Sequence, residues 1–172
     1  VRIVAEQAAG RVDVIAGTGS NSTAEAVRMT KLAAEVGATG TLQVSPYYNK
    51  PTQEGLYRHF ATIADATDLP MVVYNIPGRT AVNVETPTLM RLAEHRNIVA
   101  VKEASGSMGQ VMDVCSKKPD GFSVLSGDDN LTLPLLSLGG TGVVSVVSNI
   151  APKLMSEMVR LALAEDYEAA RA

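Results

Sequence analysis

The sequence predicts an α/β fold in which parallel strands alternate with helices. Short apolar runs typical of buried parallel strands recur along the chain, and each is followed by a segment with helical periodicity. The strand–helix unit repeats about every 25 residues, and neither a linker nor a shift in composition divides the chain. Right-handed crossovers between parallel strands leave two architectures open, a doubly wound sheet and a (β/α)8 barrel.

The first elements follow local capping and strand signals. A helix over 1–9 ends at Gly10 and has no capping residue in front of it. A strand is predicted over 12–16. Ser22 is then expected to begin a helix that continues to about Val36, with Glu25 completing a capping box.

The middle of the chain repeats this unit. A strand over 40–44 precedes a helix from about 53 to 66, and a strand over 71–74 follows. Thr86 is expected to cap the next helix, with Pro87 at its first position. The buried stripe of the helix over 53–66 is expected to contain Leu56, Phe60 and Ile63.

The remaining units give about six strands in all. The predicted strands are 98–102, 122–125 and 142–147, and the predicted helices are 108–116, 131–138 and a last one that Pro152 opens, with Leu154, Met158 and Leu161 on its stripe. A closed barrel needs eight strands and about 250 residues. We therefore expect either an open sheet or a barrel segment, with the other strands lying mostly before Val1 and further helices after Ala172.

Composition excludes several classes of function. The chain has 172 residues and a net charge of -3, which argues against a nucleic-acid or anionic membrane partner. Apolar runs are too short to span a bilayer. The single cysteine, Cys115, cannot form an internal disulfide, so a reducing, cytoplasmic setting is expected. Neither His59 nor His95 has a ligand-like neighbour at helical spacing, so we expect no metal site.

In both architectures the active site lies at the carboxyl ends of the strands. Lys102 ends a buried apolar strand, where an ammonium either reaches water or lowers its pKa and becomes a nucleophilic amine. Tyr74 ends the preceding strand, so the two side chains are expected to converge. The predicted strand ends carry Thr18, Tyr47, Tyr48, Tyr74, Asn75, Lys102, Glu103, Gly127, Asp128 and Ser145.

Two further loops carry charged residues. Arg79 lies in a loop shaped by Pro77 and Gly78, where its guanidinium offers a bidentate fork for a carboxylate, although a surface ion pair is an equally ordinary role. The pair Asp128–Asp129 is expected to cap the helix that follows it rather than to bind a cation.

Four segments resemble the dihydrodipicolinate synthase family, whose members are also called 4-hydroxy-tetrahydrodipicolinate synthases, within the class I pyruvate aldolase and N-acetylneuraminate lyase superfamily. The segments are Ser45–Pro51, Tyr74–Thr80, Val101–Ala104 and Leu125–Asp129. The resemblance runs along the whole chain in order. It implies a (β/α)8 TIM barrel, of which residues 1–172 would supply about six of the eight strands.

The resemblance also implies a reaction and its residues. Lys102 would form an imine with pyruvate, and the derived enamine would attack L-aspartate 4-semialdehyde, without any cofactor. Tyr74 would be the main acid–base residue, and Tyr48 would complete its proton relay from a neighbouring subunit. Arg79 would hold the semialdehyde carboxylate, while Gly127 and the backbone of Val144 would line the pocket.

The family pattern further implies regulation and assembly. Asn21, Glu25 and Tyr47 match positions of a site for L-lysine as an inhibitor, although Glu25 has the capping-box explanation as well. The family is commonly a homotetramer built from two dimers. A family turn with the sequence Gly-Thr-Thr-Gly-Glu has no counterpart here and would precede Val1, so we expect a chain with these bounds to be poorly active.

Two rival functions remain open from the sequence. A sister lyase that acts on sugar acids, such as N-acetylneuraminate, shares the lysine and the tyrosine. However, Arg79 and the Tyr47–Tyr48 pair suit a short acidic aldehyde better. A barrel that only binds a ligand is disfavoured because Lys102, Tyr74, Tyr48 and Arg79 occur together.

Overall fold

The computed structural model describes residues 1–172 and contains one parallel sheet of six strands. The strands are β1 (Ile15–Gly17), β2 (Gly40–Val44), β3 (Met71–Asn75), β4 (Ile98–Glu103), β5 (Ser123–Ser126) and β6 (Gly142–Val143). The helices are α1 (Arg2–Ala8), α2 (Thr23–Glu35), α3 (Gln53–Ala64), α4 (Pro77–Thr80), α5 (Thr86–Ala93), α6 (Met108–Lys117), α7 (Thr132–Ser137), α8 (Pro152–Leu163) and α9 (Tyr167–Ala170), with 3-10 turns η1 (Asp129–Leu131) and η2 (Val147–Asn149).

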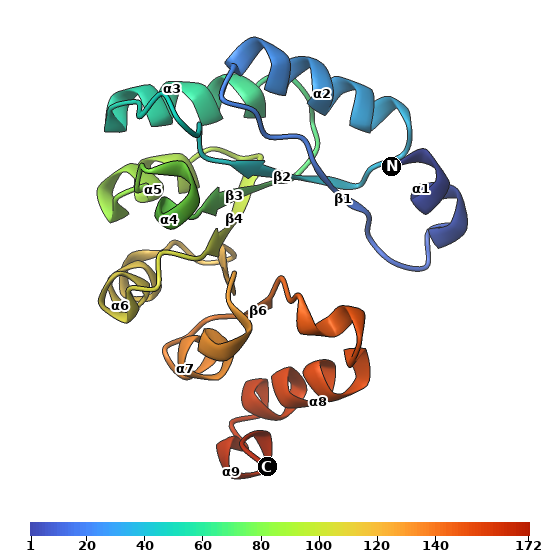
Figure 1. Cartoon of the computed structure of the whole chain (residues 1–172), viewed down its shortest axis with the longest axis vertical. Coiled ribbons are helices and arrows are strands. Elements are labelled where there is room, and N and C mark those ends of the chain that lie inside the picture. Colours follow the sequence, from blue (N-terminus) through green and yellow to red (C-terminus); the bar gives the residue numbers. More distant parts are fainter.

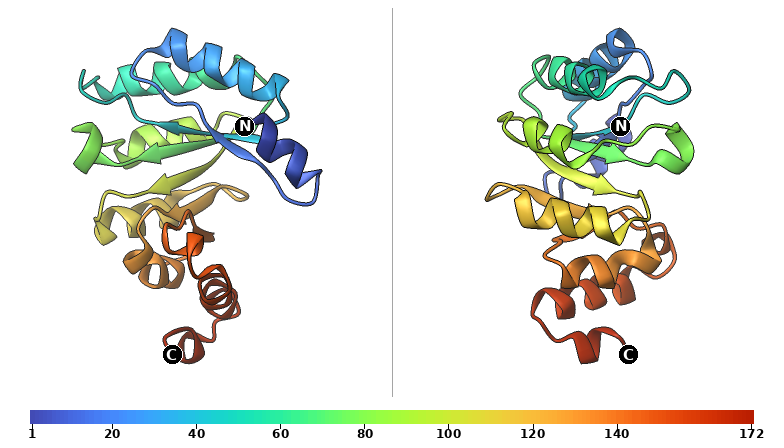
Figure 2. Two further views of the ribbon diagram at one scale, coloured as in Figure 1. Left: turned by 45° about the vertical axis from the view of Figure 1, so that its right-hand side comes forward. Right: turned by 90° about the vertical axis from the view of Figure 1, so that its left-hand side faces the viewer.

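The strands follow one another in chain order, from β1 to β6, and every neighbouring pair is parallel. Helices α2, α3, α5, α6 and α7 form an arc along one side of the curved sheet (Figures 1 and 2). A doubly wound sheet reverses its strand order and carries helices on both faces, so the arrangement is that of a half barrel. The predicted partial TIM barrel is therefore confirmed, and the open-sheet alternative is wrong.

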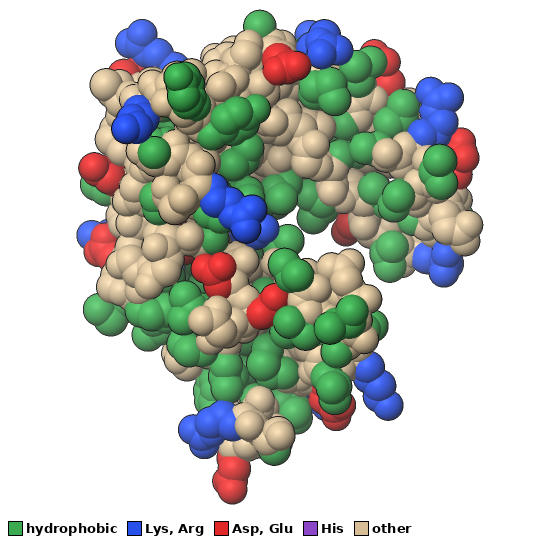
Figure 3. Space-filling view, in the orientation of Figure 1, with side chains coloured by type: hydrophobic (Ala, Val, Ile, Leu, Met, Phe, Trp, Pro, Cys, Tyr) green, Lys and Arg blue, Asp and Glu red, His purple; other side chains and the backbone are tan.

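The main core lies between the outer face of the sheet and this arc of helices. It is a cluster of 17 buried residues, which includes the predicted stripe Leu56, Phe60 and Ile63. The opposite, concave face is more open, and the molecule is hollowed on the side away from α3, α5 and α6 (Figure 3). Side chains of the sheet therefore point either into a packed core or toward this hollow.

Several local predictions are corrected by the structure. Ser22 does cap α2 by accepting the N–H of Glu25, but the Glu25 carboxylate binds the Ser20 hydroxyl at 2.6 Å instead of closing a capping box. Thr86 is predicted to cap α5, but it is the first residue of the helix. The N-cap is Glu85, and no side chain caps this helix. Capping side chains compete for nearby donors, so their sequence signal fixes a helix start only to within a residue.

The largest errors occur in the last third of the chain. The strand predicted over 142–147 ends at Val143, and the last residue of the predicted strand, Val147, already belongs to η2. Leu154, predicted on the buried stripe of α8, is 71% exposed. A short helix, α9, follows α8 and was not predicted. No helix combines the length and the apolar character that crossing a membrane requires.

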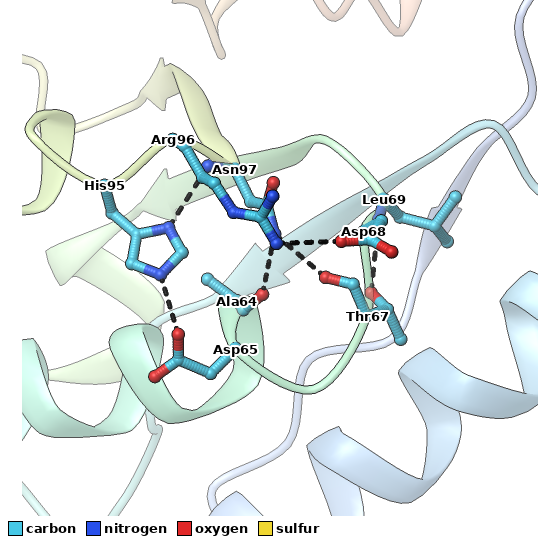
Figure 4. Close-up of polar contacts among 8 residues, drawn as sticks. All are labelled: Ala64, Asp65, Thr67, Asp68, Leu69, His95, Arg96 and Asn97. Carbon is cyan, nitrogen blue, oxygen red and sulfur yellow. Dashed lines mark hydrogen bonds and ion pairs between the residues drawn. The ribbon is translucent and has the colours of Figure 1, made fainter.

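A polar cluster joins the loops at the amino ends of β3 and β4 (Figure 4). Asn97 donates from Nδ2 to the carbonyl oxygens of Ala64 and Thr67 at 3.0 and 2.9 Å. The first bond satisfies a carbonyl that the end of α3 leaves free, and the second holds the loop that follows the helix. Two further polar pairs flank them, His95–Asp65 and Arg96–Asp68. This end of the sheet is thus tied together by structural contacts, on the side opposite to the strand ends discussed below.

We expect the ionisation of His59 to make the stability of the fold depend on pH, in the range between the pKa of His59 in the unfolded chain and its pKa in the folded chain. Burial lowers the pKa of His59 from 6.5 to about 4, while its Nδ1 lies 2.8 Å from the Thr23 hydroxyl. As the pH falls from 6.5 toward 4, His59 becomes protonated in the unfolded chain but stays neutral in the folded chain. Protonation therefore favours the unfolded state, and the free energy of unfolding decreases. The decrease corresponds to about 3 kcal/mol at most.

The variant His59→Asn keeps an acceptor for Thr23 and removes the titration. Urea denaturation across this pH range should show a shallower loss of stability for the variant than for the parent. Equal pH dependence in the two proteins would contradict this assignment.

Candidate active site

The ends of β3 and β4 bring two of the predicted site residues together. Tyr74 and Lys102 are register partners in the parallel ladder, and both are only partly buried. The Lys102 Nζ lies 3.9 Å from the centroid of the Tyr74 ring. Because their neighbours Val73 and Val101 belong to the helix-facing core, these two side chains point to the concave side.

This pairing depends on an irregularity in β4. Met71 pairs with Ile98, but the next residue, Val72, pairs with Ala100, so one residue of β4 is left over. Ile98 and Val101 both face the main core although they are three positions apart, as a bulge allows. Without the extra residue Tyr74 would lie opposite Val101. The bulge therefore sets which residues meet at the end of the strands.

Gly127 and Val144 continue the same edge beyond β5 and β6. The N–H of Gly127 donates to the Glu103 carbonyl at 2.8 Å, and the N–H of Val144 donates to the Ser126 carbonyl at 2.9 Å. A Cβ at position 127 would approach the Lys102 Cε to 3.2 Å and the Ala104 Cβ to 2.6 Å. Only glycine leaves the lysine side chain this space.

Two predicted site residues lie outside this cluster in the single chain. Arg79 is in the last turn of α4, is exposed and forms no ion pair in the structure. Tyr48 is 89% exposed and adopts a positive φ of 75°, which is uncommon for a tyrosine. The exposed phenol and the unpaired guanidinium are thus free to meet another molecule.

The prediction that the pair Asp128–Asp129 caps the helix after it is wrong, and Asp129 has a different role. Its carboxylate does not cap a helix but accepts the N–H groups of Val146 and Val147 at 3.0 and 3.1 Å. The Ser145 hydroxyl, these two N–H groups and the charge of Lys102 hold the pKa of Asp129 below its ordinary value. Asp129 therefore joins the loop after β5 to the loop after β6, close to the lysine.

The three residues matched to an inhibitor site lie near the ends of β1 and β2. Asn21 donates from Nδ2 to the Tyr47 carbonyl at 3.2 Å, and the Asn49 side chain donates back to the Asn21 carbonyl at 3.1 Å. Glu25 is held by Ser20 one turn away, at 2.6 Å. The structure thus brings Asn21 and Tyr47 into contact and leaves Glu25 beside them on the exposed start of α2.

The arrangement suits covalent chemistry on a carbonyl compound. A lysine amine attacks a carbonyl carbon, and the adjacent phenol moves protons. The structure contains no group of three or more His, Cys, Asp or Glu side chains placed to hold a metal ion. Glu103 and Asn75, for which the sequence predicts a place at strand ends but no further role, are buried behind the lysine and the tyrosine.

Comparison with known proteins identifies relatives along the whole chain. A family model described as the dihydrodipicolinate synthetase family matches residues 1–172. The chain is 62% identical over 163 residues to a 4-hydroxy-tetrahydrodipicolinate synthase of Koribacter versatilis, covering 94% of this chain and 54% of that protein. It is 60% identical over 171 residues to a synthase of the same name from Syntrophobacter fumaroxidans, covering 99% of this chain and 59% of that protein.

Solved structures show the same likeness. The dihydrodipicolinate synthase of Aquifex aeolicus superposes with a TM-score of 0.97 at 50% identity, covering 99% of this chain and 58% of that one. The chain thus spans between 54% and 59% of the length of these relatives.

We expect Asp129→Ala to loosen the loop after β6. Removing the carboxylate leaves the N–H groups of Val146 and Val147 without their acceptor. Amide hydrogen exchange of residues 145–149 should become about tenfold faster, which matches the loss of about 1–2 kcal/mol of hydrogen bonding. Asp128→Ala is the matched control, because only the backbone of Asp128 forms hydrogen bonds. Unchanged exchange in Asp129→Ala would contradict the role of the carboxylate.

Proposed function

The chain belongs to the dihydrodipicolinate synthetase family, and on this premise we propose that its full-length protein condenses pyruvate with L-aspartate 4-semialdehyde. The product would be 4-hydroxy-tetrahydrodipicolinate, an intermediate on the route to diaminopimelate and lysine. The observation that supports this most directly is the Lys102 amine at 3.9 Å from the Tyr74 ring, at the carboxyl end of a half barrel. We place the reaction in the cytoplasm.

The reaction proceeds through an imine on Lys102. The free amine attacks the ketone carbon of pyruvate, and water leaves as the C=N bond forms. The cationic imine withdraws electrons, so a methyl proton is lost and an enamine results. The enamine carbon then attacks the aldehyde carbon of the semialdehyde, whose oxygen takes up a proton. The amino group of that substrate finally displaces Lys102 as the ring closes, so the lysine serves in place of a cofactor.

The remaining site residues have roles that fit their positions. Tyr74 lies next to the reacting nitrogen, where its phenol can exchange protons and bind the pyruvate carboxylate. Gly127 leaves room beside the Lys102 Cε, and the backbone of Val144, which donates to the Ser126 carbonyl, would border the same pocket. The guanidinium of Arg79 forms no ion pair in the chain and would hold the carboxylate of the semialdehyde.

Tyr48 requires a second copy of the chain. In one chain it is 89% exposed, and its hydroxyl forms no hydrogen bond with Tyr74. We propose that it completes the proton relay of a neighbouring subunit in a homo-oligomer, most simply in each dimer of a tetramer built from dimers. Its strained backbone supports this, because a positive φ at an exposed tyrosine is costly unless contacts retain it.

We also propose that L-lysine binds near Asn21, Glu25 and Tyr47. A dihydrodipicolinate synthase from Cyanidioschyzon merolae, 48% identical to this chain, was solved with lysine bound. In this chain Asn21 touches the backbone of Tyr47 at 3.2 Å, and the exposed Glu25 offers a carboxylate for an amino group. Lysine would then act as an inhibitor at a distance from Lys102.

Borohydride trapping tests the imine. Full-length protein treated with pyruvate and borohydride should gain the mass of a reduced pyruvate adduct, and peptide analysis should locate it on Lys102. Lys102→Arg keeps the positive charge but has no nucleophilic amine, so it should gain no mass and lose at least about a thousandfold in turnover. An adduct on another lysine, or turnover by the arginine variant, would refute the proposal. Turnover of N-acetylneuraminate but not of the semialdehyde would favour a sister lyase.

Arg79→Ala should weaken binding of the semialdehyde selectively. Loss of one bidentate, charge-assisted contact should raise its KM about tenfold to a hundredfold and change the KM for pyruvate little. Arg79→Lys should recover only part of this loss, since an ammonium cannot form the paired bonds. Steady-state kinetics with each substrate varied in turn measures both constants, and an equal rise in both would assign Arg79 a structural role.

A further inference from the structure

We propose that Glu103 is a positioning residue for the condensation. Its buried carboxylate fixes the ends of β3 and β4 from behind, so that Tyr74 and Lys102 face each other on the concave side. The inference rests on the proposed function and adds a residue to which that function assigns no role.

Glu103 is a buried acidic residue, which is unusual because charged side chains are rarely buried without a charged partner. It is the last residue of β4 and only 4% exposed. Because side chains alternate along a strand, it points to the helix side while Lys102 points to the hollow. Its register partner is Asn75, which is fully buried, just as Lys102 is the register partner of Tyr74. One polar pair therefore lies directly behind the other.

The carboxylate is held only by neutral donors. The Asn75 Nδ2 donates to its Oε2 at 3.1 Å and lies 3.4 Å from its Oε1. The Gln110 Nε2 donates to Oε2 at 3.3 Å, and the N–H of Ser105 donates to Oε1 at 2.7 Å. Lysine, arginine and histidine side chains form no ion pair with it. A buried carboxylate is costly unless such donors satisfy it, so these contacts must be kept in register.

The same network reaches the loop that follows α4. Asn75 also donates to the Asn83 Oδ1 at 2.8 Å and accepts the N–H of Val84 at 3.0 Å. Asn83 donates in turn to the Gln110 Oε1 at 2.8 Å. Gln110 lies in the first turn of α6. Glu103 thus connects the ends of two strands, the loop after the Arg79 helix and the start of α6.

An amide cannot replace the carboxylate without conflict. Both Asn75 and Gln110 donate to Oε2, and the Ser105 N–H donates to Oε1. Glutamine at position 103 has nearly the same shape but carries an NH2 group on one side. In either orientation that group meets at least one N–H donor. The strand ends must then move, and a shift of about 1 Å at a reacting pair costs on the order of a hundredfold in rate.

The test compares Glu103→Gln with the parent in the full-length protein. We expect kcat to fall about tenfold to a hundredfold and the KM for pyruvate to change less than about threefold. The rate of borohydride trapping by pyruvate should fall in parallel, whereas the final extent of labelling per folded chain should equal that of the parent. If Glu103 only stabilised the fold, Glu103→Gln would lower the fraction of chains that become labelled. The rate at which the remaining folded chains are trapped would then equal that of the parent.

Two further variants complete the experiment. Gln110→Met keeps the length of the side chain on α6 and removes its hydrogen bonds to Glu103, Asn83 and the Val84 carbonyl. A loss of kcat in the same direction, about threefold to tenfold, is therefore expected even if Glu103→Gln fails to fold. Glu35→Gln makes the same chemical change at an exposed position of α2 and should leave kcat and trapping rate unaltered.

The outcomes separate the two proposals. If the parent protein traps pyruvate and both network variants keep the parental kcat and trapping rate, the positioning role is overturned and the proposed function stands. If Glu35→Gln loses activity as much as Glu103→Gln, the positioning role is also overturned. If the parent itself forms no adduct, the proposed function fails and the positioning role fails with it.

Discussion

The register between β3 and β4 is the constraint on which the site depends. A parallel ladder lets only register partners on the same face meet closely, and the bulge after Ile98 makes Tyr74 the partner of Lys102. A shift of one residue would turn one of the two side chains to the other face of the sheet. The 3.9 Å contact between the ammonium and the ring is thus a result of backbone pairing several residues away.

The two faces and the two ends of the sheet carry residues with different roles. The helix face holds the main core and, at its carboxyl end, the buried pair Asn75 and Glu103. The concave face holds the lysine and the tyrosine. At the amino end, Asn97 ties two loops together through carbonyl oxygens, a structural contact without reactive groups. Reactive side chains therefore gather at the carboxyl end of the sheet, where the buried pair Asn75 and Glu103 lies behind them.

Much of this organisation was predictable because its signals are local. Apolar runs located all six strands, the stripe Leu56–Phe60–Ile63 located a core helix, and Ser22 located a helix start. The wrong predictions concern segments whose structure depends on contacts with residues far away in the sequence. The strand predicted over 142–147 stops early, since Asp129 accepts the N–H groups of Val146 and Val147. Leu154 lies at a position where helical periodicity predicts a core residue, yet it is exposed. Periodicity identifies the apolar face of a helix but not whether another element packs against that face.

By itself the sequence determined the class of fold, the order of its elements and the residue types at the strand ends, because the periods of helices and strands and the turn residues act over a few positions. The resemblance in four segments added the family. Only the tertiary structure decided that β4 carries a bulge, that Glu103 gathers three neutral donors, and that Asp129 bridges two loops. These features join residues far apart along the chain, and no local pattern specifies which buried donor will meet which acceptor.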